Sequence, residues 1–177
     1  TVSPSSITAM FAPSKCELRT WLRANTEVEE APPSSFQVFL ANQGIRHEIR
    51  VLEELKADHP DWVDVDGYNN PAATSDTAGE IRSGKPLIYQ GKLEAVNSEL
   101  GRGPVRIIGY PDFLVKAGEG YVIADAKLAR SVLRTTNDGT AVPKPDKRHI
   151  ALQLQLYGWL FKNQFPDLDF ELVVCNG

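Results

Sequence analysis

Two aspartates and one lysine near the middle of the chain have the types and spacing that metal-dependent hydrolysis needs. Asp112 and Asp125 lie on either side of a short glycine-containing stretch, and Lys127 follows Asp125 by two positions. Two neighbouring carboxylates repel each other, and a hard divalent cation with oxygen ligands offsets that repulsion. Such a cation polarises a phosphoryl oxygen and lowers the pKa of a bound water, while a nearby ammonium orients the water or stabilises charge on the phosphate. Asp112, Asp125 and Lys127 are therefore candidate catalytic residues for phosphodiester cleavage.

A β-hairpin is the element that would bring these side chains together. Residues 118–119 begin with glycine and suit a two-residue type II′ turn. Counting outward along both strands sets Asp112 opposite Asp125, with Cβ atoms about 5 Å apart. Lys127 then shares their face, because side chains alternate along a strand. The same three residues also suit a solvent-facing hairpin with an exposed ion pair, since so short a pattern has many chance matches. Apolar neighbours predict a core sheet instead: Val105, Ile107, Phe113, Val122 and Ile123.

Helices and strands are both expected around the hairpin. Apolar residues at spacings of three and four predict a helix from Phe36 to about Asp58, capped by Ser34 or Ser35. Its expected buried stripe is Phe36, Phe39, Leu40, Gln43, His47, Val51 and Leu55. A second helix is predicted over residues 149–162 and a final strand over residues 170–174.

The other segments have weaker patterns. The first 21 residues predict two short helical pieces separated at Pro13. Apolar residues between 88 and 96 predict a short strand or hairpin, and β-like runs span residues 105–115 and 121–127. Residues 59–80 and 135–146 are rich in polar and turn-forming residues and are expected to be loops.

Composition limits the class of protein. Hydrophobic residues make up 42% of the 177 residues and charged residues 24%, which is typical of one globular domain. No apolar run approaches the roughly 20 residues that span a bilayer, and no secretion signal is evident, so we expect a cytoplasmic protein without membrane contact. The chain begins with Thr1 and is expected to be trimmed at either end or cut from something longer. Two cysteines supply neither a disulfide framework nor four thiolates for a metal or cluster.

Charge is unevenly distributed along the chain. The formal net charge is -4, yet residues 127–148 hold six bases against two acids. Such a strip can attract phosphate, although charge alone favours an ordinary solvated loop. The candidate DNA-binding residues of this strip, apart from Lys127, are Arg130, Arg134, Lys144, Lys147 and Arg148.

Four short motifs, taken in order, resemble the PD-(D/E)XK nuclease superfamily in its RecB-like branch. Residues 109–112 resemble its G-x-P-D element, and residues 125–127 its (D/E)-x-K element, with Asp in place of the commoner Glu. Residues 44–48 resemble the upstream helix that carries a metal-binding His, and residues 153–157 match its Q-x-x-x-Y helix. The order and spacing agree over roughly residues 36–162.

The resemblance implies a restriction-endonuclease-like core, an α/β fold with a central mixed β-sheet flanked by helices. It implies Mg²⁺ or Mn²⁺ held by His47, Asp112, Asp125 and the carbonyl of Ala126. It gives catalytic roles to Asp112, Asp125, Lys127, Gln153 and Tyr157. From the residues alone, His47 in an apolar stripe is more often a packed core residue than a ligand, and Gln153 with Tyr157 equally suits an exposed helical pair.

The N-terminus is similar to the start of CRISPR-associated RecB-like exonucleases. Residues 5–8 and 13–19 carry that similarity, and Cys16 fits the first ligand of those proteins' iron–sulfur cluster. Cys175 stands almost at the end, and no trio of cysteines follows it. We therefore expect no iron–sulfur cluster in this chain and interpret Cys16 as a small buried apolar residue.

Together these patterns predict a metal-dependent deoxyribonuclease, an exonuclease acting on single-stranded ends in DNA processing, repair or CRISPR adaptation, with DNA and proteins of such a complex as partners. The alternatives are a catalytically inactive nucleic-acid-binding or assembly module and a purely structural domain. Intact Asp112, Asp125 and Lys127 argue against inactivity.

Overall fold

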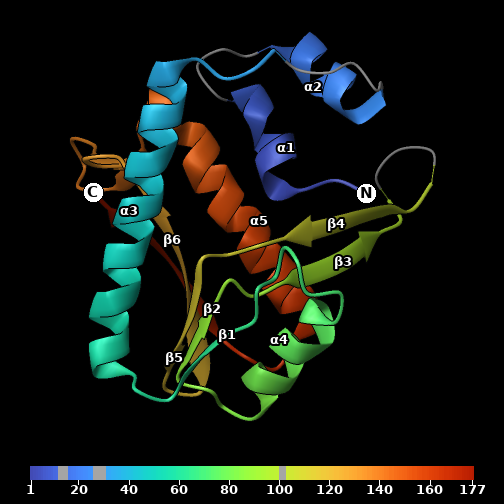
Figure 1. The fold of residues 1–177 in the computed structure, drawn as a ribbon, viewed down its shortest axis with the longest axis vertical. Coiled ribbons are helices and arrows are strands. Elements are labelled where there is room, and N and C mark those ends of the chain that lie inside the picture. Colours follow the sequence, from blue (N-terminus) through green and yellow to red (C-terminus); the bar gives the residue numbers. More distant parts are fainter. Residues whose placement is uncertain (12–15, 26–30, 100–102) are drawn as a thin grey trace.

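A mixed five-stranded sheet lies at the centre of the molecule and carries helices on both faces (Figure 1). The computed structural model describes residues 1–11, 16–25, 31–99 and 103–177. The strand order is β1-β2-β5-β6-β9; β1 pairs with β2 and β6 with β9 in parallel, and the other pairs are antiparallel. The strands are β1 (Trp62–Asp64), β2 (Leu87–Tyr89), β5 (Phe113–Ala117), β6 (Gly120–Lys127) and β9 (Phe170–Asn176). The predicted α/β class with a mixed central sheet flanked by helices is confirmed.

The hairpin of β5 and β6 has the predicted turn and register. Gly118 has a φ of 56°, whereas Glu119 does not have a positive φ, as a type II′ turn requires. Ala117 pairs with Gly120 and Phe113 with Ala124. Asp112 immediately precedes β5. Extending the register by one residue places Asp112 opposite Asp125.

The two faces of the sheet pack against different helices. Buried residues on one face contact α3 (Ser35–Asp58), and these are Leu87, Phe113 and Ala124 with Val51 and Leu52. Their strand neighbours face α5 (Arg148–Gln164), and these are Ile88, Leu114 and Ile123 with Leu154, Leu160 and Phe161. Because side chains alternate along β6, Asp125 and Lys127 continue the α5 face, while Ala124 and Ala126 continue the α3 face.

Helix α3 begins as predicted but buries only part of its expected stripe. The Ser34 hydroxyl accepts from the Gln37 backbone N–H, and the Gln37 side chain accepts from that of Ser34, a capping box. Within the core cluster on this face, α3 contributes only its later residues, such as Val51 and Leu52. Three predicted core residues are instead exposed: Phe36, Phe39 and Leu40.

Helix α5 and strand β9 confirm the predicted second helix and final strand, but two expected loops contain regular structure. Residues 59–80 hold β1 and most of α4 (Ala73–Arg82). Helix α4 buries only Ala73, Thr77 and Ile81, so polar residues mask its four-residue spacing. Residues 135–146 overlap a small hairpin followed by a 3-10 turn, β7 (Leu133–Thr135), β8 (Ala141–Pro143) and η2 (Pro145–Lys147).

The β-like runs on either side of residue 100 are divided between two sheets. Apolar residues near 88–96 split into β2 and β3 (Leu93–Asn97), and those at 105–115 into β4 (Val105–Gly109) and β5. Strands β3 and β4 form a separate two-stranded sheet, to which Val2 adds an isolated bridge at Ile107, and Figure 1 shows their hairpin extending away from the central strands. This division leaves residues 90–92 and 110–112 as links between the two sheets.

The N-terminal segment forms short helices, α1 (Pro4–Thr8), η1 (Ala9–Phe11) and α2 (Glu17–Asn25). The predicted break at Pro13 lies outside the described residues. Cys16 is exposed, so its prediction as a buried apolar residue is wrong: nothing in the described part of the chain covers it. None of the helices that the structure describes combines the length and apolar character needed to cross a bilayer.

Candidate active site

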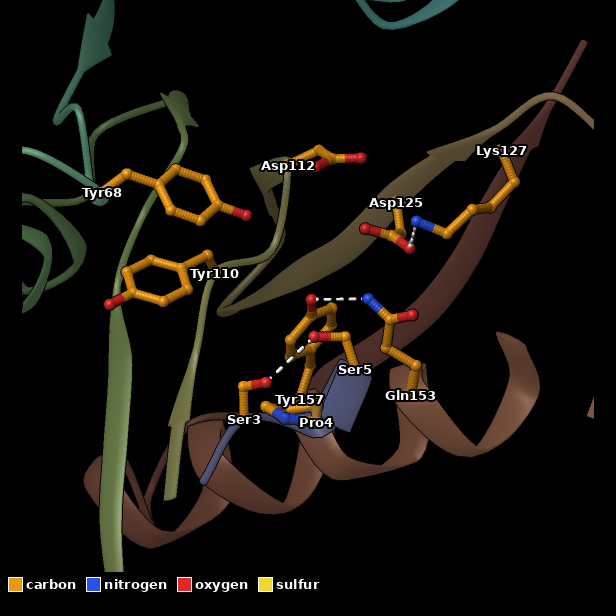
Figure 2. A pocket seen from close by; sticks show the side chains of 10 residues that line it. All are labelled: Ser3, Pro4, Ser5, Tyr68, Tyr110, Asp112, Asp125, Lys127, Gln153 and Tyr157. Carbon is orange, nitrogen blue, oxygen red and sulfur yellow. Dashed lines mark hydrogen bonds and ion pairs between the residues drawn. The ribbon is translucent and has the colours of Figure 1, made fainter. Parts of the chain in front are cut away.

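A cavity of ≈ 200 Å³ lies at the end of the sheet where β5 begins and β6 ends. Its wall combines α1, the turn after β1, the link between β4 and β5, the end of β6 and helix α5 (Figure 2). The lining residues are Ser3, Pro4, Ser5, Tyr68, Tyr110, Asp112, Asp125, Lys127, Gln153 and Tyr157. The cavity therefore gathers all five residues that were predicted to be catalytic.

Backbone contacts on both sides fix the position of Asp112. Its carboxylate Oδ2 accepts the N–H of Ala126 at 2.7 Å, which ties it to β6. Its own carbonyl accepts the N–H of Gln90 at 2.9 Å, just beyond the end of β2. Asp112 is thus held between two neighbouring strands, with its carboxylate aimed into the cavity (Figure 2).

Asp125 and Lys127 form a close ion pair on the floor of the cavity. Asp125 is only 1% exposed, and the Nζ atom of Lys127 lies 2.5 Å from its Oδ2 atom. This contact joins a buried carboxylate to an ammonium whose side chain is 28% exposed. A single ammonium thus faces two carboxylates, those of Asp112 and Asp125, which leaves excess negative charge in a partly buried space.

The pKa shifts follow from this crowding. Burial, and next the charge of Asp125, raise the pKa of Asp112 well above its usual range, with Lys127 acting in the opposite direction. Burial lowers the pKa of Lys127, but the carboxylates of Asp125 and Asp112 outweigh burial and raise it overall. Lys127 therefore keeps its proton at neutral pH in the metal-free protein, so it can donate to a water or phosphate oxygen.

Gln153 and Tyr157 lie one turn apart on α5 and form a direct pair, as their spacing predicted. The Gln153 side-chain amide donates to the Tyr157 hydroxyl at 2.8 Å. Tyr157 is 4% exposed, and burial followed by the charge of Asp125 raises its pKa. The end of β4 approaches this ring closely, because a Cβ on Gly109 would lie 2.8 Å from Tyr157 Cδ1. The glycine of the G-x-P-D element is thus explained by packing against α5.

The structure does not bring His47 to the cavity. Its Nε2 atom donates to the carbonyl of Cys175 at 2.8 Å, and its Nδ1 atom accepts from Arg50 at 3.0 Å, so both ring nitrogens are engaged. Helix α3 lies on the face of the sheet opposite the Asp125 side chain. His47 is therefore a buried residue that joins α3 to β9. Its predicted role as a metal ligand has no geometric support here.

The next residue, Glu48, was missed and is electrostatically part of the site. Its carboxylate accepts from the Tyr89 hydroxyl at 2.7 Å, and its charge raises the pKa values of Asp112 and Lys127. Glu48 is the last residue of the 44–48 motif and follows His47 directly, and this position could have identified it as a candidate site residue. Tyr68 was also missed, because it lies in a polar stretch that was expected to be a loop.

The basic residues that were predicted to bind DNA do not line the cavity. Arg130, Arg134 and Arg148 are exposed, while Lys144 and Lys147 are half-buried. They follow the end of β6 through the β7–β8 hairpin to the start of α5, and none of them lines the cavity. Lys147 lies 3.5 Å from Asp146, and the Arg148 guanidinium lies 5.5 Å from the Phe11 ring centroid.

The donor set at the cavity suits one hard cation. Among the described residues, no three His, Cys, Asp or Glu side chains gather as a ready-made metal site. Asp112 and Asp125 nevertheless offer carboxylate oxygens to the cavity from two directions. Mg²⁺ typically uses one or two carboxylates and completes its shell with water and substrate phosphate. The residues present therefore fit Mg²⁺ or the similar Mn²⁺.

No protein-family model matches the chain, and no curated protein sequence matches it.

Proposed function

We propose that this chain is a metal-dependent nuclease of the PD-(D/E)XK type that hydrolyses phosphodiester bonds in DNA. The observation that carries the proposal is the convergence of Asp112, Asp125 and the protonated Lys127 on one cavity. Two partly buried carboxylates with a single ammonium are unfavourable by themselves. They become favourable when a cation and a phosphate share the space between them.

Asp112 and Asp125 are the residues that would hold Mg²⁺ or Mn²⁺, with the carbonyl of Ala126 as a further candidate ligand. When bound, the cation supplies a polarised phosphoryl oxygen and a water of lowered pKa. Asp112 can hold its ligand oxygen still, because the Ala126 N–H and the backbone bond to Gln90 fix its orientation. Such rigid positioning is what metal-assisted hydrolysis needs from a protein.

Lys127 and the pair on α5 act on the phosphate and the attacking water. Lys127 donates a hydrogen bond, and its positive charge stabilises the negative charge that builds up on the phosphate during attack. The Tyr157 hydroxyl accepts from Gln153, which directs the hydroxyl proton away from that amide and toward the cavity. Both groups are protonated donors at neutral pH, so they stabilise an anion rather than repel it.

Cleavage of end-labelled single- and double-stranded DNA with Mg²⁺ or Mn²⁺ tests the proposal. We expect the intact chain to cut DNA only with metal, and Asp125→Ala and Lys127→Ala to lose cleavage. The matched control is Asp167→Ala, which removes an exposed carboxylate far from the cavity and leaves cleavage unchanged. The product ladder separates exonuclease from endonuclease action, and an RNA of the same sequence tests the choice of nucleic acid.

Two other results would contradict the proposal. DNA binding without metal-dependent cleavage would support an inactive binding or assembly module. Cleavage that survives Asp125→Ala at the wild-type rate would place the activity outside this cavity.

A further inference from the structure

An exposed aromatic ring stands at the mouth of the cavity. Tyr68 lines the cavity yet is 65% exposed. One face of its ring stacks on Tyr110, with ring centroids 4.3 Å apart and an interplanar angle of 20°. Figure 2 shows both rings beside Asp112, with the Tyr68 hydroxyl directed toward the carboxylates. Tyr68 therefore has a rigid backing and a surface that is open to solvent.

The turn that carries Tyr68 is held in place by its own backbone. The N–H of Gly67 donates to the Gln90 carbonyl at 2.9 Å. A Cβ at Gly67 would lie 2.5 Å from that oxygen and 3.1 Å from the Tyr110 ring, so only glycine fits here. Asp66 has a φ of 49°, and its carbonyl accepts from Asn69 and Asn70. The ring is thus presented by an ordered turn, which lowers the entropy lost when a ligand binds it.

The size of the cavity decides what part of a nucleotide it can take. Its ≈ 200 Å³ is smaller than the roughly 300–1,000 Å³ of ordinary small-ligand pockets. A phosphate group with its cation and water fits such a space. The space is too small to hold a nucleobase in addition. A base attached to that phosphate must therefore lie outside, at the rim, where the open surface of Tyr68 stands.

We propose that Tyr68, backed by Tyr110, stacks on an unpaired base next to the phosphate held at Asp112 and Asp125. The site thereby selects single-stranded DNA. Every base has a π face that an aromatic side chain can bind, but in a duplex that face is already covered by neighbouring base pairs. This proposal rests on the proposed function for the position of the phosphate, and it adds a residue that sets substrate class.

Two hydrogen-bond donors near the stacked rings suit a nearby phosphate. A tyrosine hydroxyl is protonated at neutral pH, and that of Tyr68 points toward Asp112 and Asp125, so it can donate to an anion held there. The ammonium of Lys92 lies 6.0 Å from the centroid of the Tyr110 ring that backs Tyr68. The ring can therefore bind the base while its hydroxyl and Lys92 face the negatively charged backbone.

The test is a double-mutant cycle between the protein and its ligand, measured as binding. The probe is a fluorescein-labelled single-stranded oligodeoxynucleotide, and a set of variants carries one abasic sugar at successive positions. Every protein in the set carries Lys127→Ala, which stops cleavage under the proposed function, and binding is followed by fluorescence anisotropy in Mg²⁺. Position 68 is Tyr, Phe or Leu, and thermal melts check that each variant folds.

Stacking predicts a specific pattern. Tyr68→Leu weakens binding of the intact strand about 5- to 100-fold, whereas Tyr68→Phe, which keeps the ring, changes it about 2-fold or less. At one position, an abasic sugar weakens binding to the Tyr68 protein by a similar factor but has almost no effect on the Leu variant. Binding of a duplex is equally weak for all three.

Equal abasic effects in the Tyr68 and Leu backgrounds at every position would overturn the proposal, and so would a Phe variant that binds as weakly as the Leu variant. These readings do not depend on cleavage. If the wild-type chain cuts DNA but the coupling is absent, only the role of Tyr68 fails. If the coupling is present but no metal-dependent cleavage occurs, the proposed nuclease activity fails instead.

Discussion

Replacing Asp112 by Asn should stabilise the metal-free protein, although it removes a proposed ligand. The amide oxygen of Asn can still accept the Ala126 N–H that Asp112 accepts now. The substitution removes one of two neighbouring buried negative charges and leaves Asp125 paired with Lys127. The folded chain therefore loses a repulsion without losing the hydrogen bond.

The sign of the pH dependence follows from the raised pKa of Asp112. An unfolded Asp titrates near 3.9, whereas burial and Asp125 move the folded pKa well above that value. Between the two values the folded state binds the extra proton. Stability is therefore complete below about pH 4 and falls as the pH rises through the folded pKa. Asn at position 112 does not titrate, so its advantage appears only as the pH rises.

The magnitude can be bounded from the same shift. The folded pKa of Asp112 is about 8, and one pKa unit corresponds to about 1.36 kcal/mol, so Asp112→Asn gains at most about 5 kcal/mol of stability at pH 8.5. For a chain of this length 1 kcal/mol moves the Tm by about 2–4 °C. We therefore expect the variant to have a higher Tm at pH 8.5, by at most about 10–20 °C, and a much smaller difference at pH 4.5.

Thermal unfolding followed by circular dichroism in EDTA, at pH 4.5 and 8.5, measures this effect. Adding Mg²⁺ at 100 times its Kd should then stabilise the wild type by about 2.7 kcal/mol and raise its Tm accordingly. The same addition should raise the Tm of Asp112→Asn far less. Asp167→Asn, which changes an exposed carboxylate, is the control. A variant that is less stable than wild type at pH 8.5 in EDTA would refute the charge argument. A gap of equal size at both pH values would refute the assigned pKa.

Three further predictions concern the frame around the site. Leu52→Ala should destabilise the chain by about 2–5 kcal/mol in urea unfolding because Leu52 is 6% exposed, whereas Phe36→Ala, at a 68% exposed position, should change it by less than about 1 kcal/mol. Gly67→Ala should weaken single-stranded DNA binding in the anisotropy assay as much as Tyr68→Leu does, because the added Cβ meets a backbone oxygen and displaces the turn. Tyr157→Phe keeps the packed ring but removes the hydroxyl, so kcat for DNA cleavage should fall about 10-fold or more while the Tm changes by only a few degrees.

The hairpin and the helical pair were predictable because local chemistry determines them. A glycine-first two-residue turn fixes the register of β5 and β6, and strand alternation then fixes the shared face of Asp125 and Lys127. Gln153 and Tyr157 are four residues apart on a helix, which is enough to predict that they touch. None of these steps needs the tertiary structure.

The contribution of α3 was not predictable in the same way. His47 and Glu48 are adjacent on one helix, and their side chains point about 100° apart. Which of them faces the carboxylates depends on how α3 is rotated against the sheet, and packing of Val51 and Leu52 on Leu87 and Phe113 sets that rotation. The exposed first turns have the same origin, because the helical period predicts a stripe but not the length of sheet available to cover it.

The position of Asp112 links the fold to the proposed chemistry. It lies just outside β5, where its carbonyl is bonded to Gln90 beyond β2 and its carboxylate is bonded to Ala126 in β6. A carboxylate on a flexible loop would turn away from Asp125 and relieve the repulsion by itself. Here the two backbone bonds prevent that, and a raised pKa is the remaining response of the isolated chain. A bound cation offers a stronger response, so the rigidity that destabilises the empty pair is also what would give the site its affinity for metal.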